Sequence, residues 1–373
     1  MKVLFSIDSL QQGGAEQSIA NLISNFSTDL EVIVLYFYSD GRPDLLPLYQ
    51  KLPCRIYSLD LKGKYNWKKG IQGMREILKK EKPSIVVSSL YRSNIISRFA
   101  CRYENVRLIG TIVDDPYNLE RKKTFRGLNR IKFHLSWLLD RVTINRVYGW
   151  ISNSESIGIS NAQILGIKLS TIRVVYRGRK STDFQQWTCP ESDHFIFATI
   201  GRLFEKKGYP ELIQAFHMIH KKSSHARLMV YGEGSYRGEI EKLISEYGLA
   251  ESVILMGNVP YAWKELYKAH CFVFPSRFEG FSGALVEALM TGIPVICSDI
   301  PMNLEAIIPD ETAIVHTLKD PQDLATKMEY AISNYPAMME MGKRARENTI
   351  NKFDIRNIAK QYEETLKEFA GKN

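Results

Sequence analysis

Residues 271–297, CFVFPSRFEGFSGALVEALMTGIPVIC, contain a strand, a loop, a helix and a second strand in close succession. The first strand is the apolar run Cys271–Phe274, which has strand length and stops at Pro275. A loop carrying Glu279-Gly280-Phe281 follows, and a helix begins near Ser282-Gly283. The apolar run Pro294–Cys297 is the second strand. Because parallel strands need a helical crossover between them, this order predicts a parallel sheet covered by helices.

Apolar runs of the same kind recur along the chain in two groups. The first group comprises Val3–Ile7, Glu31–Tyr38, Ser84–Ser88 and Arg107–Val113, and the second adds Phe195–Ile200, Arg227–Tyr231 and Val253–Met256. Segments with helical periodicity lie between the runs of each group. The segment Tyr176–Asp193 between the two groups is polar and irregular, as in a linker. We therefore predict an α/β protein of two Rossmann-like, doubly wound domains that face a cleft, at residues 1–178 and 190–350, followed by a C-terminal helix at 351–373.

The predicted helix start near Ser282 has the physical properties of a phosphate site. Its free backbone N–H groups and the positive end of the helix dipole favour an anion. Gly280 and Gly283 allow a ligand to approach the backbone closely. Glu279 and Glu287 flank this start, and carboxylates accept hydrogen bonds from sugar hydroxyls. Because ligands of doubly wound sheets bind outside the strand C-termini, we expect a nucleotide here.

The same residues carry a resemblance to a known family. Glu279, seven intervening residues and Glu287 stand within F-E-G-F-S-G-x-x-x-E-A-L-x-x-G-x-P, which resembles the signature of family 4 glycosyltransferases. The resemblance implies a GT-B fold, with the C-terminal helix returning to the N-terminal domain, and retaining transfer of a hexose from a UDP- or GDP-sugar. It implies that Glu279 holds sugar hydroxyls and Glu287 the ribose. The other donor-binding residues that it implies in this segment are Gly280, Phe281, Ser282, Gly283 and Ala284.

Three further segments extend the resemblance. Gly201–Gly208 (GRLFEKKG) resembles the family's G-R-x-x-x-x-K-G, which implies that Arg202 and Lys207 meet the donor diphosphate. Fixed cations there would stabilise the charge that develops on the leaving group. Gly13 and Gly14, in Gly-Gly-Ala-Glu, resemble the family's first loop and would reach donor and acceptor, and Val259 would meet the nucleobase through its main chain. A solvated basic turn remains the alternative for residues 202–207.

The acceptor half departs from the family pattern. Many relatives have a histidine near the end of the strand corresponding to Arg107–Val113, where this chain has Thr-Ile-Val-Asp-Asp-Pro at 111–116. Asp114 is a candidate by position alone, and an aspartate before a proline more often caps a turn. The resemblance suggests that the leaving phosphate oxygen itself takes the acceptor proton, with Arg202, Lys207 and Glu279 as the catalytic residues.

Charge is unevenly distributed along the chain. The net charge is +9, and residues 1–180 contain 29 Lys and Arg against 15 Asp and Glu. The segments Leu119–Phe133 and Lys62–Lys69 mix cations with aromatic residues, a composition that suits an anionic lipid surface, single-stranded nucleic acid or a solvated helix face. Given the resemblance, we expect a glycan or polyprenyl-linked acceptor at an anionic membrane surface, and no nucleic acid partner.

The composition also argues against a metal site. No D-x-D triplet or His/Cys cluster occurs, so we expect no metal and no cofactor other than the sugar nucleotide as substrate. Five scattered cysteines, the absence of a signal-peptide core and the absence of an apolar run of bilayer length predict a cytoplasmic protein, peripheral on the inner face of the membrane. A nucleotide-sugar epimerase of the same fold and a nucleic-acid-binding protein remain as alternatives.

Overall fold

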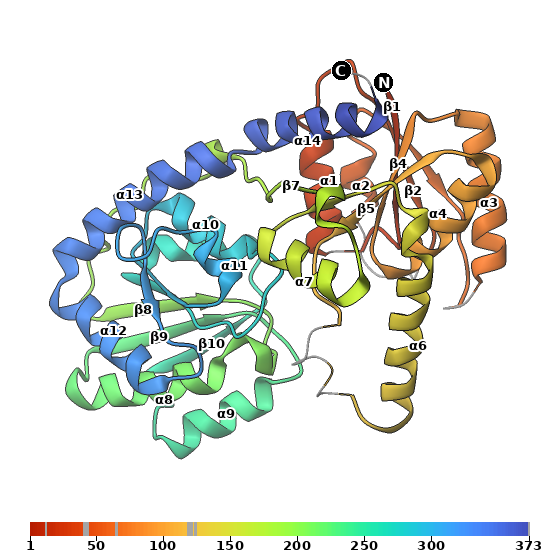
Figure 1. Cartoon of the computed structure of the whole chain (residues 1–373). Coiled ribbons are helices and arrows are strands. Elements are labelled where there is room, and N and C mark those ends of the chain that lie inside the picture. Colours follow the sequence, from red (N-terminus) through yellow and green to blue (C-terminus); the bar gives the residue numbers. More distant parts are fainter. Residues whose placement is uncertain (12, 40–44, 64–65, 118–121, 123–124, 372–373) are drawn as a thin grey trace. The chain divides into compact units, whose positions relative to one another are not determined.

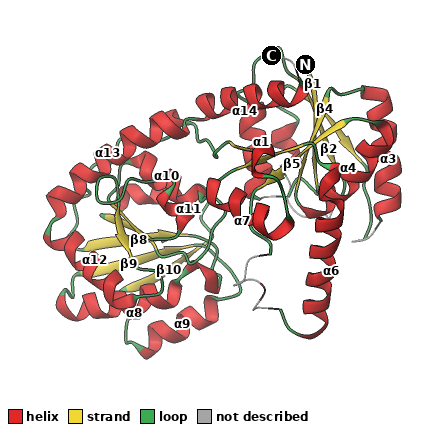
Figure 2. Ribbon diagram, in the orientation of Figure 1, coloured by secondary structure: helices red, strands yellow, loops and turns green. Residues whose placement is uncertain are grey.

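A computed structural model describes residues 1–373 except 12, 40–44, 64–65, 118–121, 123–124 and 372–373 (Figure 1). The chain divides into two compact units, Met1–Gly178 with Ile355–Asn373, and Arg179–Asp354. Each unit has one sheet, and every pairing between the described strands is parallel. Helices cover both faces of each sheet (Figure 2), so the predicted class of two Rossmann-like α/β units is confirmed.

The first unit contains a seven-stranded sheet with the order β3-β2-β1-β4-β5-β6-β7. Its strands are β1 (Lys2–Ile7), β2 (Glu31–Tyr36), β3 (Cys54–Ser58), β4 (Ile85–Ser89), β5 (Arg107–Ile112), β6 (Gly149–Ser152) and β7 (Ile172–Val174). Its helices are α1 (Gly14–Ile23), α2 (Leu46–Tyr49), α3 (Trp67–Glu81), α4 (Tyr91–Glu104), α6 (Gly127–Thr143), α7 (Glu155–Leu165) and α14 (Ile355–Ala370). Short 3-10 turns, η1 (Ile144–Arg146) and η2 (Leu169–Thr171), follow α6 and α7.

The central strand β1 shows why this sheet is covered on both faces. Successive side chains point to opposite faces of a strand. Val3 and Phe5 accordingly belong to the core shared with α1 and α14, whereas Leu4 belongs to the core shared with α3 and α4. All three are fully buried, which explains why the strand is an unbroken apolar run rather than an alternating one.

The C-terminal helix α14 packs on the first unit, as the sequence analysis expected. The Tyr362 ring lies 6.3 Å from the Phe5 ring, and Ser27 Oγ donates to Glu363 Oε2 at 2.8 Å. Gly149 in β6 provides the space for the end of this helix, because a Cβ there would lie 2.4 Å from Phe369. The last helix therefore completes the core of the first unit.

The second unit contains a six-stranded sheet with the order β10-β9-β8-β11-β12-β13. Its strands are β8 (Phe195–Ile200), β9 (Ala226–Tyr231), β10 (Val253–Gly257), β11 (Cys271–Phe274), β12 (Val295–Ser298) and β13 (Ile314–His316). Its helices are α8 (Tyr209–Lys222), α9 (Arg237–Glu246), α10 (Gly283–Thr291), α11 (Pro301–Leu304), α12 (Pro321–Ser333) and α13 (Tyr335–Phe353). The 3-10 turns of this unit are η3 (Ser181–Asp183), η4 (Glu205–Lys207) and η5 (Ala262–Lys268).

The predicted linker, residues 176–193, packs on the second unit through buried aromatic side chains. Phe184 and Trp187 are buried, and Trp187 Nε1 donates to the carbonyl oxygen of Ala269 at 3.0 Å. The Phe184 ring lies 4.5 Å from the Trp263 ring. These two aromatic anchors explain why the second unit begins at residue 179, before the predicted start at 190.

Candidate functional site

Two loops of the second unit meet at the carboxyl ends of β8 and β11. Gly208 has a φ of +73°, and a Cβ there would lie 2.0 Å from the carbonyl oxygen of Pro275. The backbone N–H of Arg277 donates to the carbonyl of Lys206 at 2.8 Å, and Arg277 Nη2 pairs with Glu211 at 2.7 Å. Only glycine fits such a left-handed, closely approached position without strain. The loop that carries Lys207 is therefore fixed against the loop that carries Glu279.

Lys207 and Glu279 form an ion pair between these loops. Lys207 Nζ contacts Glu279 Oε1, and only 14% and 10% of the two side chains are exposed. Ser276 Oγ donates to the same carboxylate oxygen at 2.6 Å. Within the part of the chain that the structure describes, the contacts of Glu279 are made by Oε1, which leaves Oε2 for a ligand hydroxyl. A charged acceptor and a cation are thus placed side by side.

Hydrogen bonds from buried polar groups fix the loop that carries Glu279. Asn303 Nδ2 donates to Ser298 Oγ at 3.0 Å, and Ser298 Oγ donates to the carbonyl of Ser276 at 2.5 Å. All three residues have no exposed surface. Tyr209 Oη donates to the carbonyl of Gly201 at 2.8 Å, and burial raises the pKa of Tyr209 well above its usual range. Among the described residues Asn303 Oδ1 is buried without a hydrogen-bond partner, but the other hydrogen bonds of this neutral support restrict where the carboxylate can point.

The start of α10 offers main-chain donors beside this pair. Ser282 is the N-cap, and its hydroxyl accepts the backbone N–H of Leu285 at 3.4 Å. The amides of Gly283 and Ala284, earlier in the first turn, have no partner within the helix by its geometry. The Phe281 side chain does not face a ligand site. It is buried against Phe353, and the two ring centres lie 5.3 Å apart. Its contribution to a ligand is therefore limited to its main chain, like that of Gly280.

Glu287 has a partner that the sequence did not suggest. Arg179 Nε donates to Glu287 Oε1 at 2.7 Å, and both side chains are about one-fifth exposed, at 18% and 21%. Gly283 permits this arrangement, because a Cβ there would lie 2.0 Å from Arg179 Nη2. Arg179 thereby lies over the start of α10 and fixes one oxygen of the carboxylate that would hold a ribose.

Arg202 and Val259 do not join the Lys207–Glu279 pair. Arg202 is exposed, and its guanidinium carbon lies 5.0 Å from the centre of the Phe204 ring. Val259 is half-buried and follows Gly257, whose carbonyl accepts the backbone N–H of Gly232 at 2.7 Å. Their predicted contacts with diphosphate and nucleobase stay predictions.

Gly13 and Gly14 lie at the start of α1 in the first unit. A Cβ at Gly13 would lie 2.3 Å from Glu16 Oε2, and one at Gly14 would lie 3.1 Å from Arg177 Nη1. Glycine therefore lets two charged side chains lie over this helix start, and burial raises the pKa of the Glu16 carboxyl. Residue 12 of the same predicted loop lies outside the described residues. A donor-binding role for this segment stays a prediction.

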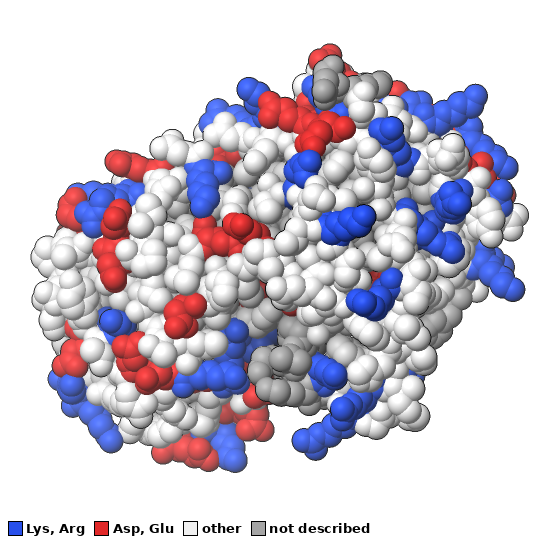
Figure 3. Space-filling model, in the orientation of Figure 1, with Lys and Arg blue, Asp and Glu red and all other residues white. Residues whose placement is uncertain are grey.

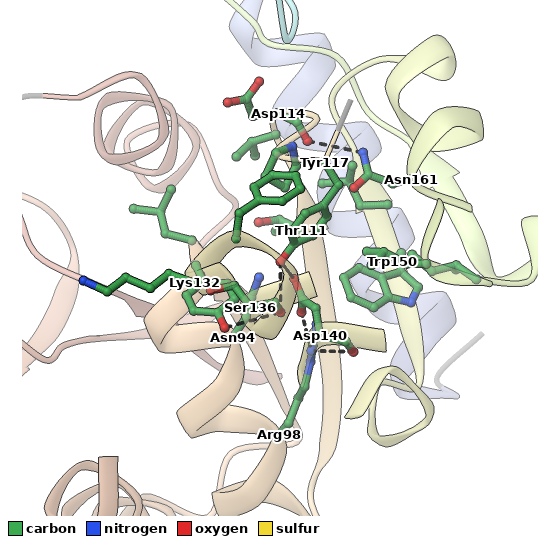
Figure 4. A pocket seen from close by; sticks show the side chains of 18 of the residues that line it. Asn94, Arg98, Thr111, Asp114, Tyr117, Lys132, Ser136, Asp140, Trp150 and Asn161 are labelled. Carbon is green, nitrogen blue, oxygen red and sulfur yellow. Dashed lines mark hydrogen bonds and ion pairs between the residues drawn. The ribbon is translucent and has the colours of Figure 1, made fainter. Parts of the chain in front are cut away.

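The first unit also contains a cavity of about 420 Å³, lined by residues that follow β4 and β5 and by α4, α6 and α7 (Figure 4). At its base Arg98 Nη1 pairs with Asp140 Oδ1 at 2.5 Å, and Tyr117 Oη donates to Asp140 Oδ2 at 2.7 Å. Among the described residues, Asn94 Oδ1 and Arg98 Nε are buried without a hydrogen-bond partner. None of these four residues was predicted from the sequence, since polar groups far apart in the chain give no local motif.

Asp114 lies at the edge of this cavity, and its Oδ1 accepts the backbone N–H of Asp115 at 2.9 Å. It therefore caps the turn that follows β5. In the described parts of the chain no cluster of three or more His, Cys, Asp or Glu side chains could hold a metal ion, and the five cysteines are free.

Family models match the two halves of the chain. The model described as Glycosyltransferase Family 4 matches residues 12–181, and the one described as Glycosyl transferases group 1 matches residues 180–348. An uncharacterized glycosyltransferase of Methanocaldococcus jannaschii is 35% identical over 122 residues, which are 33% of this chain and 30% of that protein. This chain thus matches less than a third of that relative's length.

A longer match is to an N-acetylgalactosamine-N,N'-diacetylbacillosaminyl-diphospho-undecaprenol 4-alpha-N-acetylgalactosaminyltransferase of Campylobacter jejuni, 26% identical over 82% of each chain. The solved structure of Anabaena HepE in complex with UDP has the same fold, with a TM-score of 0.81 at 18% identity over 99% of this chain and 100% of that one. The group 1 match includes Lys207, Glu279 and Glu287, and Arg179 lies in the family 4 match. The chain therefore belongs to the family 4 glycosyltransferases of GT-B fold, with a group 1 glycosyl transferase domain as its second unit.

Proposed function

We propose that this protein is a retaining, metal-independent glycosyltransferase that moves a hexose from a UDP- or GDP-sugar to a glycan or lipid-linked glycan, in the synthesis of a cell-surface polysaccharide. The observation that carries the proposal is the Lys207–Glu279 pair, held by Ser276 beside the first turn of α10. The cation and the free amides suit a diphosphate, and Glu279 Oε2 suits a sugar hydroxyl. The Campylobacter relative is named as a transferase that acts on a sugar joined to undecaprenol through a diphosphate, which supports a lipid diphosphate sugar as acceptor.

The same residues support chemistry at a leaving diphosphate. Negative charge develops on the phosphate oxygens as the sugar–phosphate bond breaks, and donors fixed before the reaction lower the barrier most. Lys207 is held in place by Glu279, while Arg202 is exposed and free to move toward the ligand. In the proposed mechanism the departing oxygen takes the proton of the acceptor hydroxyl on the same face of the sugar. The configuration is then retained without an enzyme nucleophile.

The cavity beside α6 supports an acceptor site in the first unit. Its lining combines aromatic side chains with Asn94, Lys132 and the Arg98–Asp140 pair, a mixture that suits the apolar face and the hydroxyls of a sugar. The basic charge of the first 180 residues supports a phosphate-bearing acceptor at the inner face of a membrane.

Thermal shifts with UDP, GDP, UDP-glucose and GDP-mannose test the proposal first. A ligand at one hundred times its Kd stabilises the protein by about 2.7 kcal/mol, which is readily measured. Turnover of the stabilising sugar nucleotide is then compared in Glu279→Gln, Arg202→Ala and the wild type, with Lys206→Met as the matched control beside Lys207. Wild-type turnover in both site variants would remove the assignment, and release of an isomerised sugar nucleotide without transfer would indicate an epimerase.

A further inference from the structure

Helix α6 presents a continuous apolar stripe to solvent. The stripe consists of large side chains spaced three, four, three and four residues apart, each between 47% and 75% exposed: Leu128, Ile131, Leu135, Leu138 and Val142. Residues at such spacing lie on one face of a helix. Single exposed apolar residues are normal, whereas a contiguous exposed stripe marks an interaction surface.

The opposite face of α6 already has its own partners. Asp140 pairs with Arg98, the Phe133 ring lies 5.7 Å from the Tyr117 ring, and Trp137 Nε1 donates to the carbonyl of Ile164 at 3.3 Å. The helix is therefore anchored to the first unit through one side only. Figures 1 and 2 show α6 extending past the sheet of that unit. The exposed stripe is therefore separate from the face through which α6 packs on the first unit.

The charges on α6 identify the chemistry of the partner. The exposed charged side chains of the helix are all cations: Arg130, Lys132 and Arg141, with exposed His134 between them. Its one acidic residue, Asp140, is buried and paired with Arg98. Figure 3 shows Lys and Arg spread widely over the visible face of the first unit. An apolar stripe flanked by cations is the pattern of a helix that lies in an anionic lipid interface.

A second copy of the chain fits this face less well. Two α6 stripes packed together would place Arg130 and Arg141 of each copy beside cations of the other, with no exposed carboxylate on α6 to compensate. Like charges across an interface destabilise it. A transmembrane role is not supported either, since no helix among the described residues has the length and hydropathy to cross a bilayer.

We propose that α6 docks the first unit on an anionic lipid surface, with the stripe from Leu128 to Val142 inserted at the boundary between headgroups and acyl chains. Lys132 and Phe133 on the same helix line the cavity described above. Docking through α6 would therefore place that cavity about one helix diameter, ~10 Å, from the membrane surface, where a lipid-linked acceptor would be. The docking itself does not depend on the proposed enzymatic activity.

Co-sedimentation with vesicles tests this proposal. The wild type is expected to bind vesicles of equal parts phosphatidylcholine and phosphatidylglycerol, to bind phosphatidylcholine vesicles far less, and to lose binding as salt is raised. Leu135→Gln with Leu138→Gln is expected to lower the partition coefficient at least about tenfold. Arg130→Gln is expected to lower it about fivefold, the effect of one cation near an anionic surface.

Leu169→Gln is the matched control, because Leu169 is 59% exposed and Leu135 60%, and both lie in the first unit. Equal losses in Leu135→Gln and Leu169→Gln, or no vesicle binding by the wild type, would overturn the proposal. So would a dimer in light scattering that Leu135→Gln converts to a monomer. Thermal shifts with UDP-glucose on the same variants separate a failure of docking from a failure of the proposed function.

Discussion

Alanine at positions 208 and 283 would meet an obstacle at the same distance, yet we expect a large loss of stability at the first position and little change at the second. A Cβ at Gly208 lies 2.0 Å from the carbonyl oxygen of Pro275, and a Cβ at Gly283 lies 2.0 Å from Arg179 Nη2. The first obstacle is backbone at the end of a buried strand. The second is the far end of a flexible side chain. The cost of each substitution depends on which atoms have to move.

For Gly208→Ala two costs add. The φ of +73° places the residue in the left-handed region, where an L side chain costs about 1–2 kcal/mol. Moving the Pro275 carbonyl away from the new Cβ strains a packed region, at about 1–3 kcal/mol. We therefore expect a loss of about 3 kcal/mol, which lowers the Tm of the second unit by about 6–12 °C. The loops that carry Lys207 and Glu279 would separate as well.

For Gly283→Ala the gain in helix stability and the cost of losing an ion pair nearly cancel. Alanine in place of glycine within a helix gains about 0.5–1 kcal/mol, and losing a partly exposed ion pair such as Arg179–Glu287 costs about 0–1 kcal/mol. The Tm is expected to stay within a few degrees of the wild type. Binding of a sugar nucleotide is expected to weaken about tenfold, since Glu287 loses the partner that orients it.

Differential scanning calorimetry compares the two variants with the wild type, and titration with UDP measures nucleotide binding. Wild-type stability of Gly208→Ala would show that the two loops are not in contact. A loss in Gly283→Ala as large as in Gly208→Ala would show that Arg179 cannot move aside. Either result would refute the distinction between backbone and side-chain obstacles at this site.

Three more expectations concern the charges of the two units. Lys207→Met and Glu279→Gln each leave a nearly buried charged partner uncompensated, so each is expected to lower the free energy of unfolding by about 2–4 kcal/mol. The double variant is expected to lose about 2 kcal/mol less than the sum of the two, as measured by urea unfolding in a double-mutant cycle. Arg98→Met is expected to destabilise the first unit by about 3–5 kcal/mol, because Asp140 stays buried without its cation; Arg102→Gln at the exposed surface is the control for the same assay. Burial lowers the pKa of His316 below its ordinary value, so the unfolded chain binds a proton at higher pH than the folded one. Stability is then full above pH ~6.5 and falls as pH decreases below it, and His316→Gln is expected to flatten this dependence in Tm measurements between pH ~7 and ~5.

Most interior strands were predictable because burial on both faces makes them continuous apolar runs. The short interior strand β6 (Gly149–Ser152) was missed. β8 and β11 begin and end at the residues that the sequence indicated, and β1 differs by one residue. Among the edge strands of the described sheets, β10 was predicted to within one residue, whereas β3, β7 and β13 were not identified. β3 is half-exposed along its length and β7 has only three residues, so neither has an apolar run that stands out from its surroundings. Their place in the sheet comes from pairing with β2 and β6, which is a tertiary property.

The donor-side residues were predictable as a local motif, but their supports were not. Gly208, Glu279 and Glu287 stand in short frames that resemble the family, whereas Arg179 is separated from Glu287 by 108 positions and stands in a segment that reads as linker. Ser298 and Asn303 support the Glu279 loop through single hydroxyl and amide groups. Such groups occur throughout any sequence, and only the fold determines which of them become buried and bonded.

The basic segment 119–133 was recognised from its composition, but its structure was not. Arg121 and Lys123 of this segment, like Lys64 and Tyr65 of the other basic segment, lie outside the described residues. The described part from 127 onward is the first half of α6, and the apolar stripe continues well beyond the segment, to Val142. Helical periodicity alone does not tell whether an apolar face meets the core or solvent. The structure makes that distinction, because it shows the opposite face of α6 in contact with Arg98 and Tyr117.

The pairing of Lys207 with Glu279 has a consequence for how the second unit binds an anion. The pair carries no net charge, so a diphosphate arriving beside it gains little long-range attraction from Lys207. What the pair supplies is position, because both side chains are already desolvated and aligned before the ligand arrives. The net positive potential must then come from groups without a carboxylate partner in the site, namely the first-turn amides of α10 and Arg202. On this reasoning Arg202→Ala should slow association with UDP more strongly at low salt than at high salt, whereas Lys207→Met should mainly speed dissociation.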